Sequence, residues 1–592
     1  MSIPAHSSSL QTLWKLTAGE RLRYAAAIAA MAVGTLFLLV EPVVIKWALD
    51  ALEAGRATWW GTLVPAAMAV VTLHGTHGLF TYLRARWAAE ASEGIVRELR
   101  HRLLERLERL PSRYYDRVDT GDLVQRCSSD VETLRVFLAA QVVEIARVSL
   151  FLIFALPFML SQDLRMTLLS LLLMPVIVLY AVVFFRQVRS LFKQVDEADG
   201  KLTTVLQENL TGIRVVQAFT RQEFEFDKFM ARNGAFRDLE YRLLQMLGRY
   251  WALSDVLVLL QLGIVLVGGG YFVLQGSLSL GTWILFWWLL RTIIWPIRQI
   301  GRVLTDSGKA TVAIDRIREV LSEPIESASL QQLSSQPGAI EIRNLSFGYQ
   351  PGSLALNQLT LTIAAGETVA ILGPPGSGKT TLISLLLRLY DYDSGSIRIG
   401  GCELSTLDRD SVRSAFGVVL QDPYLFSKTI RENVVIGRSQ AADRDVEEAT
   451  RAADIHANIS EFTQGYETLV GERGTTLSGG QRQRLAIARA LLKDPQYLVL
   501  DDSLSAVDTK TESRILGALA ARRGRQTTIL IAHRLSSTRL ADRIFVLDGG
   551  RLIQAGTHDE LMAMDGPYRR LWIIQSTLEE QLRHDLDGVA AR

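Results

Sequence analysis

Cysteine is scarce in this 592-residue chain, which contains only Cys127 and Cys402. Two cysteines cannot build a disulfide scaffold or a cysteine-rich metal site. An excess of one charge is also missing, because 64 Lys and Arg stand against 62 Asp and Glu. This balance argues against a nucleic-acid-binding protein, and the hydrophobic content of 48% excludes a disordered chain. These averages still allow a chain whose two halves differ.

The first half contains apolar segments that are long enough to cross a membrane. Each has about 20 residues or more, and about 20 helical residues span a hydrocarbon core of ~30 Å. One such segment could be a buried helix of a soluble protein, but six in one half favour membrane-spanning helices. The six segments are residues 24–48, 60–83, 138–161, 166–185, 253–275 and 281–301.

The charges between these segments predict an orientation. Residues 84–135 and 186–250 each carry 11 Lys and Arg, whereas residues 276–280 carry none. Basic connections tend to stay on the cytoplasmic side of a membrane. We therefore expect a multi-pass protein of the cytoplasmic (inner) membrane with both termini in the cytoplasm.

The pattern of composition predicts the domain organisation. Residues 322–338 are rich in Ser and Gln and read as a linker, and the strand-like runs behind them alternate with helical stretches. No cleavable signal is expected before the first apolar segment, and residues 10–22 resemble an interfacial helix. The expected parts are a cytoplasmic N-terminus at 1–22, a six-helix transmembrane domain with long cytoplasmic segments at 23–305, a linker at 306–338, a nucleotide-binding domain at 339–575 and a short tail at 576–592.

A phosphate-binding loop follows the strand-like run TVAIL and precedes a helical stretch. It has the pattern G-x-x-x-x-G-K-[ST], in which backbone N–H groups wrap the phosphates of a nucleotide. Lys379 is long enough to reach the β- and γ-phosphates, and the Thr380 hydroxyl can bind Mg²⁺. The nucleotide-binding residues of the loop are Gly373, Pro374, Pro375, Gly376, Ser377, Gly378, Lys379, Thr380 and Thr381.

Two carboxylates complete the predicted ATP site. Asp501 ends the strand-like run YLVLD, where P-loop NTPases place the carboxylate that holds Mg²⁺. Asp502 follows directly and should face the γ-phosphate and the attacking water. ATP and Mg²⁺ are therefore the expected cofactors.

The pentapeptide LSGGQ lies upstream of these carboxylates and resembles the signature of ATP-binding cassette (ABC) proteins. Tyr349 in SFGYQ, Gln421 in VVLQDPYLF, SAVD at 505–508 and His533 in IAHRL follow the order of the same family. Six apolar helices ahead of one such domain resemble an exporter half-transporter. The resemblance implies an α-helical, type I exporter-like membrane domain followed by an α/β P-loop NTPase domain.

The resemblance also implies roles for single residues. Tyr349 would stack on adenine, Gln421 would contact Mg²⁺ and the attacking water, and His533 would bridge to the γ-phosphate. Thr380, Gln421 and Asp501 are the expected metal-binding residues, and Asp502, His533 and Gln421 are the expected catalytic ones. The signature residues Leu477, Ser478, Gly479, Gly480 and Gln481 would complete the ATP site of a partner subunit. Segments 120–122 and 208–225 resemble the coupling helices that seat on the nucleotide domain.

One position departs from the family pattern. Most members carry Glu directly after the strand Asp, and here it is Asp502. Asp is one methylene shorter, and a retreat of about 1 Å can cost on the order of 10²-fold in rate. The chain thus resembles the degenerate-site subunit of bacterial heterodimeric multidrug exporters, whose partner would be a second half-transporter with Glu at this position. A homodimeric lipid or peptide exporter and an ATP-binding regulatory subunit without turnover are the alternatives.

Polar residues inside the apolar segments are candidates for a substrate cavity, because they are costly in lipid. They could instead pair across helices without touching a substrate. The expected substrate is a hydrophobic or amphiphilic small molecule, the expected surroundings are membrane lipid, and no nucleic acid is expected as a partner. The cavity candidates are Glu41, His74, His77, Gln261 and Arg291.

Overall fold

The computed structural model describes residues 14, 15, 17–326, 331–334, 336–350, 352–532, 535–574, 576 and 577. These residues form two compact units. The first unit is Met1–Leu110 with Val118–Pro324, and the second is Pro111–Arg117 with Ile325–Arg592. Residues 10–13 and 16 of the expected interfacial helix, and His533, lie outside the described part of the chain.

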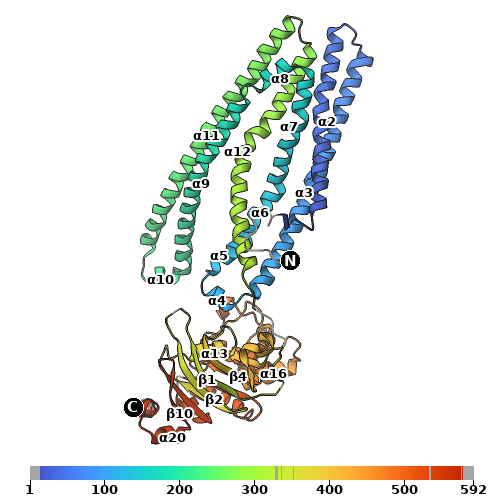
Figure 1. Ribbon diagram of the computed structural model, residues 1–592. Coiled ribbons are helices and arrows are strands. Elements are labelled where there is room, and N and C mark those ends of the chain that lie inside the picture. Colours follow the sequence, from blue (N-terminus) through green and yellow to red (C-terminus); the bar gives the residue numbers. More distant parts are fainter. Residues whose placement is uncertain are drawn as a thin grey trace. The chain divides into compact units, whose positions relative to one another are not determined.

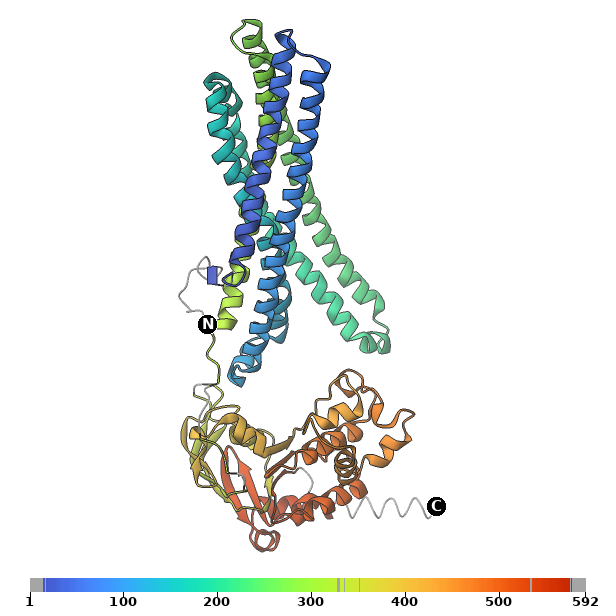
Figure 2. The ribbon, with the colours of Figure 1, turned by 90° about the vertical axis from the view of Figure 1, so that its right-hand side faces the viewer.

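Long helices make up the first unit (Figure 1). Six of them, within the described residues, are long and apolar enough to cross a membrane. Helices α9 and α11 run side by side as a hairpin with the short α10 at its turn (Figures 1 and 2). The helices are α2 (Arg21–Glu53), α3 (Val64–Glu108), α5 (Thr120–Gln125), α6 (Val131–Val136), α7 (Val142–Gln162), α8 (Leu164–Leu171), α9 (Met174–Thr211), α10 (Ile213–Ala218), α11 (Gln222–Leu274) and α12 (Leu280–Ser322), with π-helical turns at Trp59–Leu63, Arg126–Asp130 and Phe137–Gln141.

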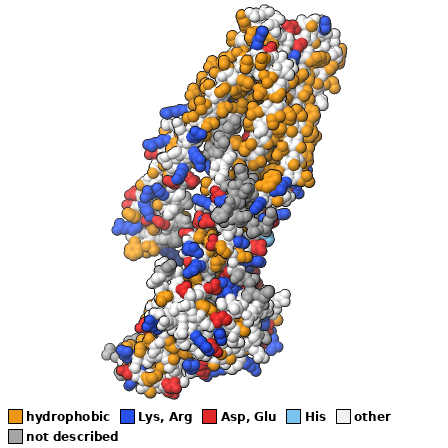
Figure 3. Space-filling view, in the orientation of Figure 1, with side chains coloured by type: hydrophobic (Ala, Val, Ile, Leu, Met, Phe, Trp, Pro, Cys, Tyr) orange, Lys and Arg blue, Asp and Glu red, His pale blue; other side chains and the backbone are white. Residues whose placement is uncertain are grey.

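Helix α12 forms the centre of the first unit, because it packs against α2, α7, α9 and α11. Phe286, Leu289 and Leu290 of α12 are buried together with Phe151 of α7 and Val265 of α11. Hydrophobic side chains cover the upper part of this unit in Figure 3, whereas charged side chains gather at the lower ends of its helices. Apolar side chains on the outside are what a lipid-exposed surface requires.

Helix α12 extends further than the sequence prediction, which assigned residues 306–338 to a linker. Residues 306–322 continue the helix to Ser322. The physical reason is helical periodicity: the buried residues Ala310, Ala313, Ile314, Ile317 and Val320 lie at positions i, i+3, i+4, i+7 and i+10, which share one face of a helix. Charged residues separate these apolar ones in the sequence, so this part of the helix contains no long apolar segment.

Two β-sheets build the second unit. A four-stranded sheet has the order β2-β1-β4-β5, and a six-stranded sheet has the order β10-β9-β3-β8-β7-β6. The five strands from β9 to β6 pair in parallel, and β3, β7 and β8 are buried at every residue. The strands are β1 (Ile340–Phe347), β2 (Leu356–Ile363), β3 (Thr368–Leu372), β4 (Ser394–Ile399), β5 (Cys402–Glu403), β6 (Phe416–Val419), β7 (Tyr497–Asp501), β8 (Thr527–Ile531), β9 (Arg543–Asp548) and β10 (Arg551–Gly556).

The register of these strands aligns the ends of β3 and β7. Ile371 of β3 and Asp501 of β7 both pair with Ile531 of β8, so both strands end at the same edge of the sheet. Helices surround the two sheets, and α13 begins directly behind the loop that follows β3. The helices are α4 (Ser112–Tyr115), α13 (Lys379–Leu386), α14 (Arg409–Ala415), α15 (Ile430–Val435), α16 (Asp443–Ala452), α17 (His456–Glu461), α18 (Gly479–Leu492), α19 (Thr509–Ala520) and α20 (His558–Ala563).

Candidate ATP site and membrane cavity

The loop between β3 and α13 wraps tightly because glycine occupies its critical positions. Gly378 caps α13 with a φ of 95°, in the left-handed region that favours glycine. A Cβ on Gly373 would lie 2.3 Å from the carbonyl oxygen of Leu547, closer than atoms can pack. The loop backbone therefore needs these two glycines to lie against β9 and to enter the helix.

Lys379 folds back onto this loop. Its Nζ donates hydrogen bonds to the carbonyl oxygens of Gly373 at 2.8 Å and Pro374 at 2.9 Å. Burial lowers the pKa of the Lys379 ammonium, and the carboxylates of Asp501 and Asp502 oppose that shift. A cation is thus held inside the phosphate-binding loop, together with the buried Ser377.

Thr380 and Asp501 form a pair of oxygen ligands that fits Mg²⁺. The Thr380 hydroxyl donates to Asp501 Oδ2 at 3.0 Å, and Asp501 is buried at the end of β7. Within the described residues no group of three or more His, Cys, Asp or Glu could hold a metal ion. Mg²⁺ commonly binds to one or two protein ligands together with nucleotide phosphates, which agrees with this small set of donors.

Asp502 has a fixed backbone and a half-buried side chain. Its φ of 45° lies in the left-handed region, which Asp tolerates better than most residues. Its N–H donates to the carbonyl oxygen of Ile531 at 3.1 Å, and its own carbonyl oxygen accepts from Ser505 Oγ at 2.8 Å. Because the backbone is held on both sides, the length of the side chain determines how far the carboxylate can reach.

The signature pentapeptide forms the beginning of α18. Ser478 caps this helix in a reciprocal capping box with Gln481, while Leu477 is buried below it. A Cβ on Gly480 would lie 2.8 Å from the carbonyl oxygen of Ala506, so the helix rests directly on the SAVD loop. Gly479 lines a neighbouring cavity, and Ser478 is exposed.

Gln483 fixes this contact, although no sequence motif marks it as a functional residue. Its Oε1 accepts from the N–H of Ala506 at 3.0 Å, and the side chain is buried. No spacing rule distinguishes this Gln from the other polar residues of α18. Gln421 is exposed and lines a cavity of about 550 Å³ that also contacts Gly479 and Gln483.

Tyr349 presents a large exposed ring beside the P-loop. Its hydroxyl donates to Thr381 Oγ1 at 3.3 Å, and its ring meets that of Tyr390 edge to face at 5.2 Å. Tyr390 in turn donates to the carboxylate of Asp116 at 2.9 Å. The structure thus gathers Lys379, Thr380, Asp501, Asp502 and Tyr349 around one loop.

Most of the predicted cavity residues have structural partners instead. Gln261 is fully buried, and its side chain donates to the Leu169 carbonyl at 2.9 Å and accepts from the Leu173 N–H at 2.8 Å. It therefore satisfies the backbone at the break between α8 and α9. Glu41 is buried and lies 3.6 Å from the exposed His74, so these two form a pair.

Arg291 does not line the cavity described next. It is exposed, and its guanidinium lies 5.8 Å from the ring centre of Trp287. Only His77 of the five candidates lines that cavity, and its Nδ1 donates to the carbonyl oxygen of Gly34 at 2.9 Å.

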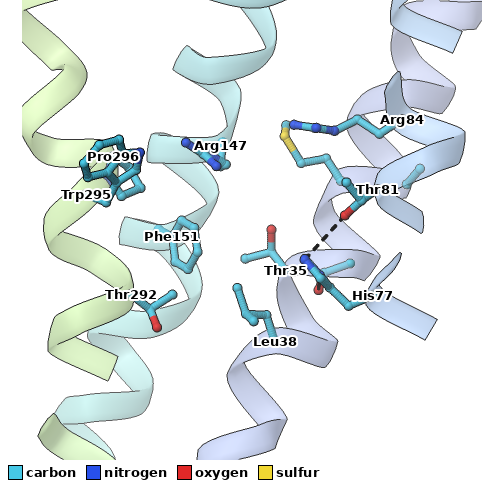
Figure 4. Close-up of a pocket in the computed structure, with 13 residues that line it drawn as sticks. Thr35, Leu38, His77, Thr81, Arg84, Arg147, Phe151, Thr292, Trp295 and Pro296 are labelled. Carbon is cyan, nitrogen blue, oxygen red and sulfur yellow. Dashed lines mark hydrogen bonds between the residues drawn. The ribbon is translucent and has the colours of Figure 1, made fainter. Parts of the chain in front are cut away.

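The cavity has a volume of about 170 Å³ and lies between α2, α3, α7 and α12 (Figure 4). Arg84 of α3 and Arg147 of α7 are among the residues that line it. Arg84 directly follows a predicted apolar segment and Arg147 lies inside another, and neither was singled out from the sequence. The residues that line it are Ala30, Met31, Gly34, Thr35, Leu38, His77, Thr81, Arg84, Arg147, Phe151, Thr292, Trp295 and Pro296.

This arrangement defines a class of protein, in which a membrane domain of six helices is joined to a P-loop ATPase with a signature helix. Residues 24–297 match the family model of the ABC transporter transmembrane region, and residues 356–505 match that of the ABC transporter. The chain belongs to the ABC transporter family. It is an ATPase-coupled transporter and an exporter half-transporter, and the expected type I exporter-like fold is confirmed.

Three relatives illustrate the similarity. The chain is 34% identical to an ATP-dependent lipid A-core flippase of Hahella chejuensis, over 96% of each chain. It is 35% identical to a multidrug efflux ATP-binding/permease protein of Mycobacterium tuberculosis, over 93% of this chain and 46% of that protein. The structure of a bacterial Atm1-family ABC exporter with ATP bound has 29% identity and a TM-score of 0.83, and the match covers 94% of this chain and 98% of that one.

Proposed function

We propose that the chain is one subunit of a heterodimer that exports amphiphilic compounds across the cytoplasmic membrane, with both termini in the cytoplasm. Its own ATP site would be slow, and its signature helix would complete the competent site of a different half-transporter. The observation that carries the proposal is Asp502, a shortened carboxylate on a fixed backbone within an otherwise complete set of ATP-binding residues.

The geometry supports slow turnover rather than loss of ATP binding. The phosphate loop, Lys379 and the Thr380–Asp501 pair are all in place. The accepting atom of a general base must lie about 2.6–3.2 Å from the heavy atom that gives up the proton, or act through one water. Asp502 cannot gain reach by moving its backbone, because Ile531 and Ser505 hold it.

In the proposed cycle, Tyr349 stacks on adenine and Lys379 binds the β- and γ-phosphates. Thr380, Asp501 and Gln421 would hold Mg²⁺, which supplies charge neutralisation at the phosphates when bound. Ser478 and Gly480 at the beginning of α18 would face the ATP of the partner subunit. Closure of the two ATPase domains would turn the membrane cavity outward, and hydrolysis at the competent site would reset it.

Exposed apolar side chains on α10 and directly after it support assembly with a partner. Val215 and Phe219 are 61% and 73% exposed at the end of a hairpin that carries many charges. Tyr424 and Phe426 of the second unit are exposed as well, beside the cavity that Gln421 lines. We infer that α10 of one subunit seats in this cavity of the other, which would bury both apolar surfaces.

The test is the ATPase activity of the assembled complex with single substitutions. Asp502→Ala should leave most of the activity, because the competent site keeps its own carboxylate. Removing the Glu of the partner should abolish turnover, and this chain purified alone should show little. Loss of all turnover from Asp502→Ala would refute the asymmetric site.

A homodimeric exporter is the second candidate, because this chain carries both a carboxylate at Asp502 and a complete signature with the Ser478–Gln481 capping box, so two copies could complete each other's ATP sites. Robust substrate-stimulated ATPase activity of the isolated chain would support it over the heterodimer.

A further inference from the structure

Two arginines face the same small cavity of the membrane domain. Arg84 reaches inward from α3, and Arg147 of α7 lines the same cavity on its other side (Figure 4). Glu144 is the carboxylate that acts on both: it accepts a hydrogen bond from Arg147, and its charge attracts Arg84. The described surroundings therefore set two positive charges against one negative charge.

The guanidinium groups have unused donors. Arg84 makes no ion pair with any described residue, and the buried Nε atoms of Arg84 and Arg147 have no hydrogen-bond partner among the described residues. Positive charges that repel each other in a medium of low dielectric constant are costly. An anion between them would remove the repulsion and accept hydrogen bonds from the guanidinium N–H groups that line the cavity, and planar guanidinium groups suit carboxylate and phosphate oxygens.

The remaining walls are apolar or carry hydroxyl groups. Leu38, Phe151 and Trp295 supply apolar surface, and Thr35 and Thr292 supply hydroxyl groups. Pockets for drug-sized ligands have volumes of roughly 300–1,000 Å³, so a cavity of about 170 Å³ takes a headgroup rather than a whole amphiphile.

We propose that this cavity binds the anionic head of a transported amphiphile, a carboxylate, sulfate or phosphate, through Arg84 and Arg147. The proposal rests on the proposed exporter function and narrows its substrate class to anionic amphiphiles. The anion can come from a soluble amphiphile or from a phospholipid headgroup, and both present the same charged oxygens to the two arginines.

The experiment compares two probes with similar tails in the assembled transporter, reconstituted in phosphatidylcholine nanodiscs. Dodecyl phosphate is the anionic probe, and dodecyl maltoside below its micelle concentration is the neutral one. In Arg84→Gln, the dodecyl phosphate concentration for half-maximal ATPase stimulation should rise at least about tenfold, the size expected for hydrogen bonds to a charged group. The response to dodecyl maltoside should not change.

Arg86→Gln is the matched control. Arg86 lies on the same helix, is exposed, pairs with Glu90 at 2.8 Å and does not line the cavity. Arg84→Lys keeps the charge and should recover most of the dodecyl phosphate stimulation that Arg84→Gln loses. Recovery would show that the loss in Arg84→Gln comes from the missing charge and not from misfolding. Equal dodecyl phosphate responses in Arg84→Gln and the unchanged protein, with basal ATPase activity intact, would overturn the inference. Absence of ATPase activity in the unchanged complex would instead refute the proposed function.

Nanodiscs that contain phosphatidylglycerol distinguish the two sources of the anion. If a lipid headgroup occupies the cavity, these nanodiscs should weaken dodecyl phosphate stimulation of the unchanged protein and leave Arg84→Gln unaffected. If the ligand is a soluble amphiphile, both nanodisc compositions should give the same half-maximal concentration. Either result supports an anion site, provided that Arg84→Gln shows the tenfold loss.

Discussion

Lengthening Asp502 by one methylene is the most direct perturbation of the proposed slow site. The substitution is Asp502→Glu in a complex whose competent site has been silenced by replacing the partner's catalytic carboxylate with its amide. Any hydrolysis that remains then comes from the P-loop of this chain. We expect the substitution to raise that residual rate.

The size of the increase follows from the fixed backbone of residue 502. Its N–H and carbonyl groups are held at 3.1 Å and 2.8 Å by Ile531 and Ser505, so an added carbon extends the carboxylate instead of moving the chain. One C–C bond is about 1.5 Å long, and a misplacement of about 1 Å can cost on the order of 10²-fold. We therefore expect an increase of about 10²-fold, which corresponds to about 2.7 kcal/mol in the activation free energy.

The assay is phosphate release by the assembled transporter in nanodiscs at saturating ATP. Asp502→Asn is the control, because it keeps the shape of the side chain and removes the base, so it should not raise the rate. ATP affinity should be the same in all three proteins, since the P-loop contacts of Lys379 are unchanged. A rate that stays within about threefold of the Asp502 complex would refute the argument that reach limits the site.

Two further substitutions test other contacts. Gly480→Ala should lower the ATPase activity of the complex at least about tenfold without reducing ATP binding to this chain, because the new methyl group would lie 2.8 Å from the carbonyl oxygen of Ala506. Gly479→Ala is the control. Its Cβ would have an ordinary contact at 3.8 Å, so α18 should stay in place on the SAVD loop. Gln261→Leu should destabilise the membrane domain by about 1–3 kcal/mol, because the N–H of the half-buried Leu173 loses its acceptor, and thermal unfolding in detergent would measure this.

That the candidate ATP-binding side chains lie close together could be expected from the sequence, because each follows or ends a strand of one sheet. Gly373 follows β3 and Asp501 ends β7, and parallel strands with a common neighbour end at one edge of a sheet. The position of each motif behind its strand therefore brings the side chains together. The membrane helices were equally predictable, because length and hydropathy alone define them.

The membrane cavity could not be predicted in the same way. Arg84 and Arg147 lie on different helices and share a cavity only because α3 and α7 both border the space beside α2 and α12. Sequence reasoning selected Gln261 for its polarity, yet the side chain bonds to backbone groups where α8 ends and α9 begins. Polarity in an apolar segment marks a residue that needs a partner, and it does not reveal whether that partner is a ligand or the chain itself.

The contact between α18 and the loop behind Asp502 gives the slow site a role in the proposed dimer. Gln483 of the signature helix accepts the Ala506 N–H at 3.0 Å, and Ser505 donates to the Asp502 carbonyl at 2.8 Å. The helix that would complete the partner's site is thus hydrogen-bonded to the loop that carries this chain's own carboxylate. ATP that stays bound in the proposed slow site beside Asp502 would hold this loop in place. The loop would in turn hold Ser478 in place while the partner's site hydrolyses ATP. Slow hydrolysis would then stabilise the competent site, which explains why a chain with a weakened base would still retain a complete signature.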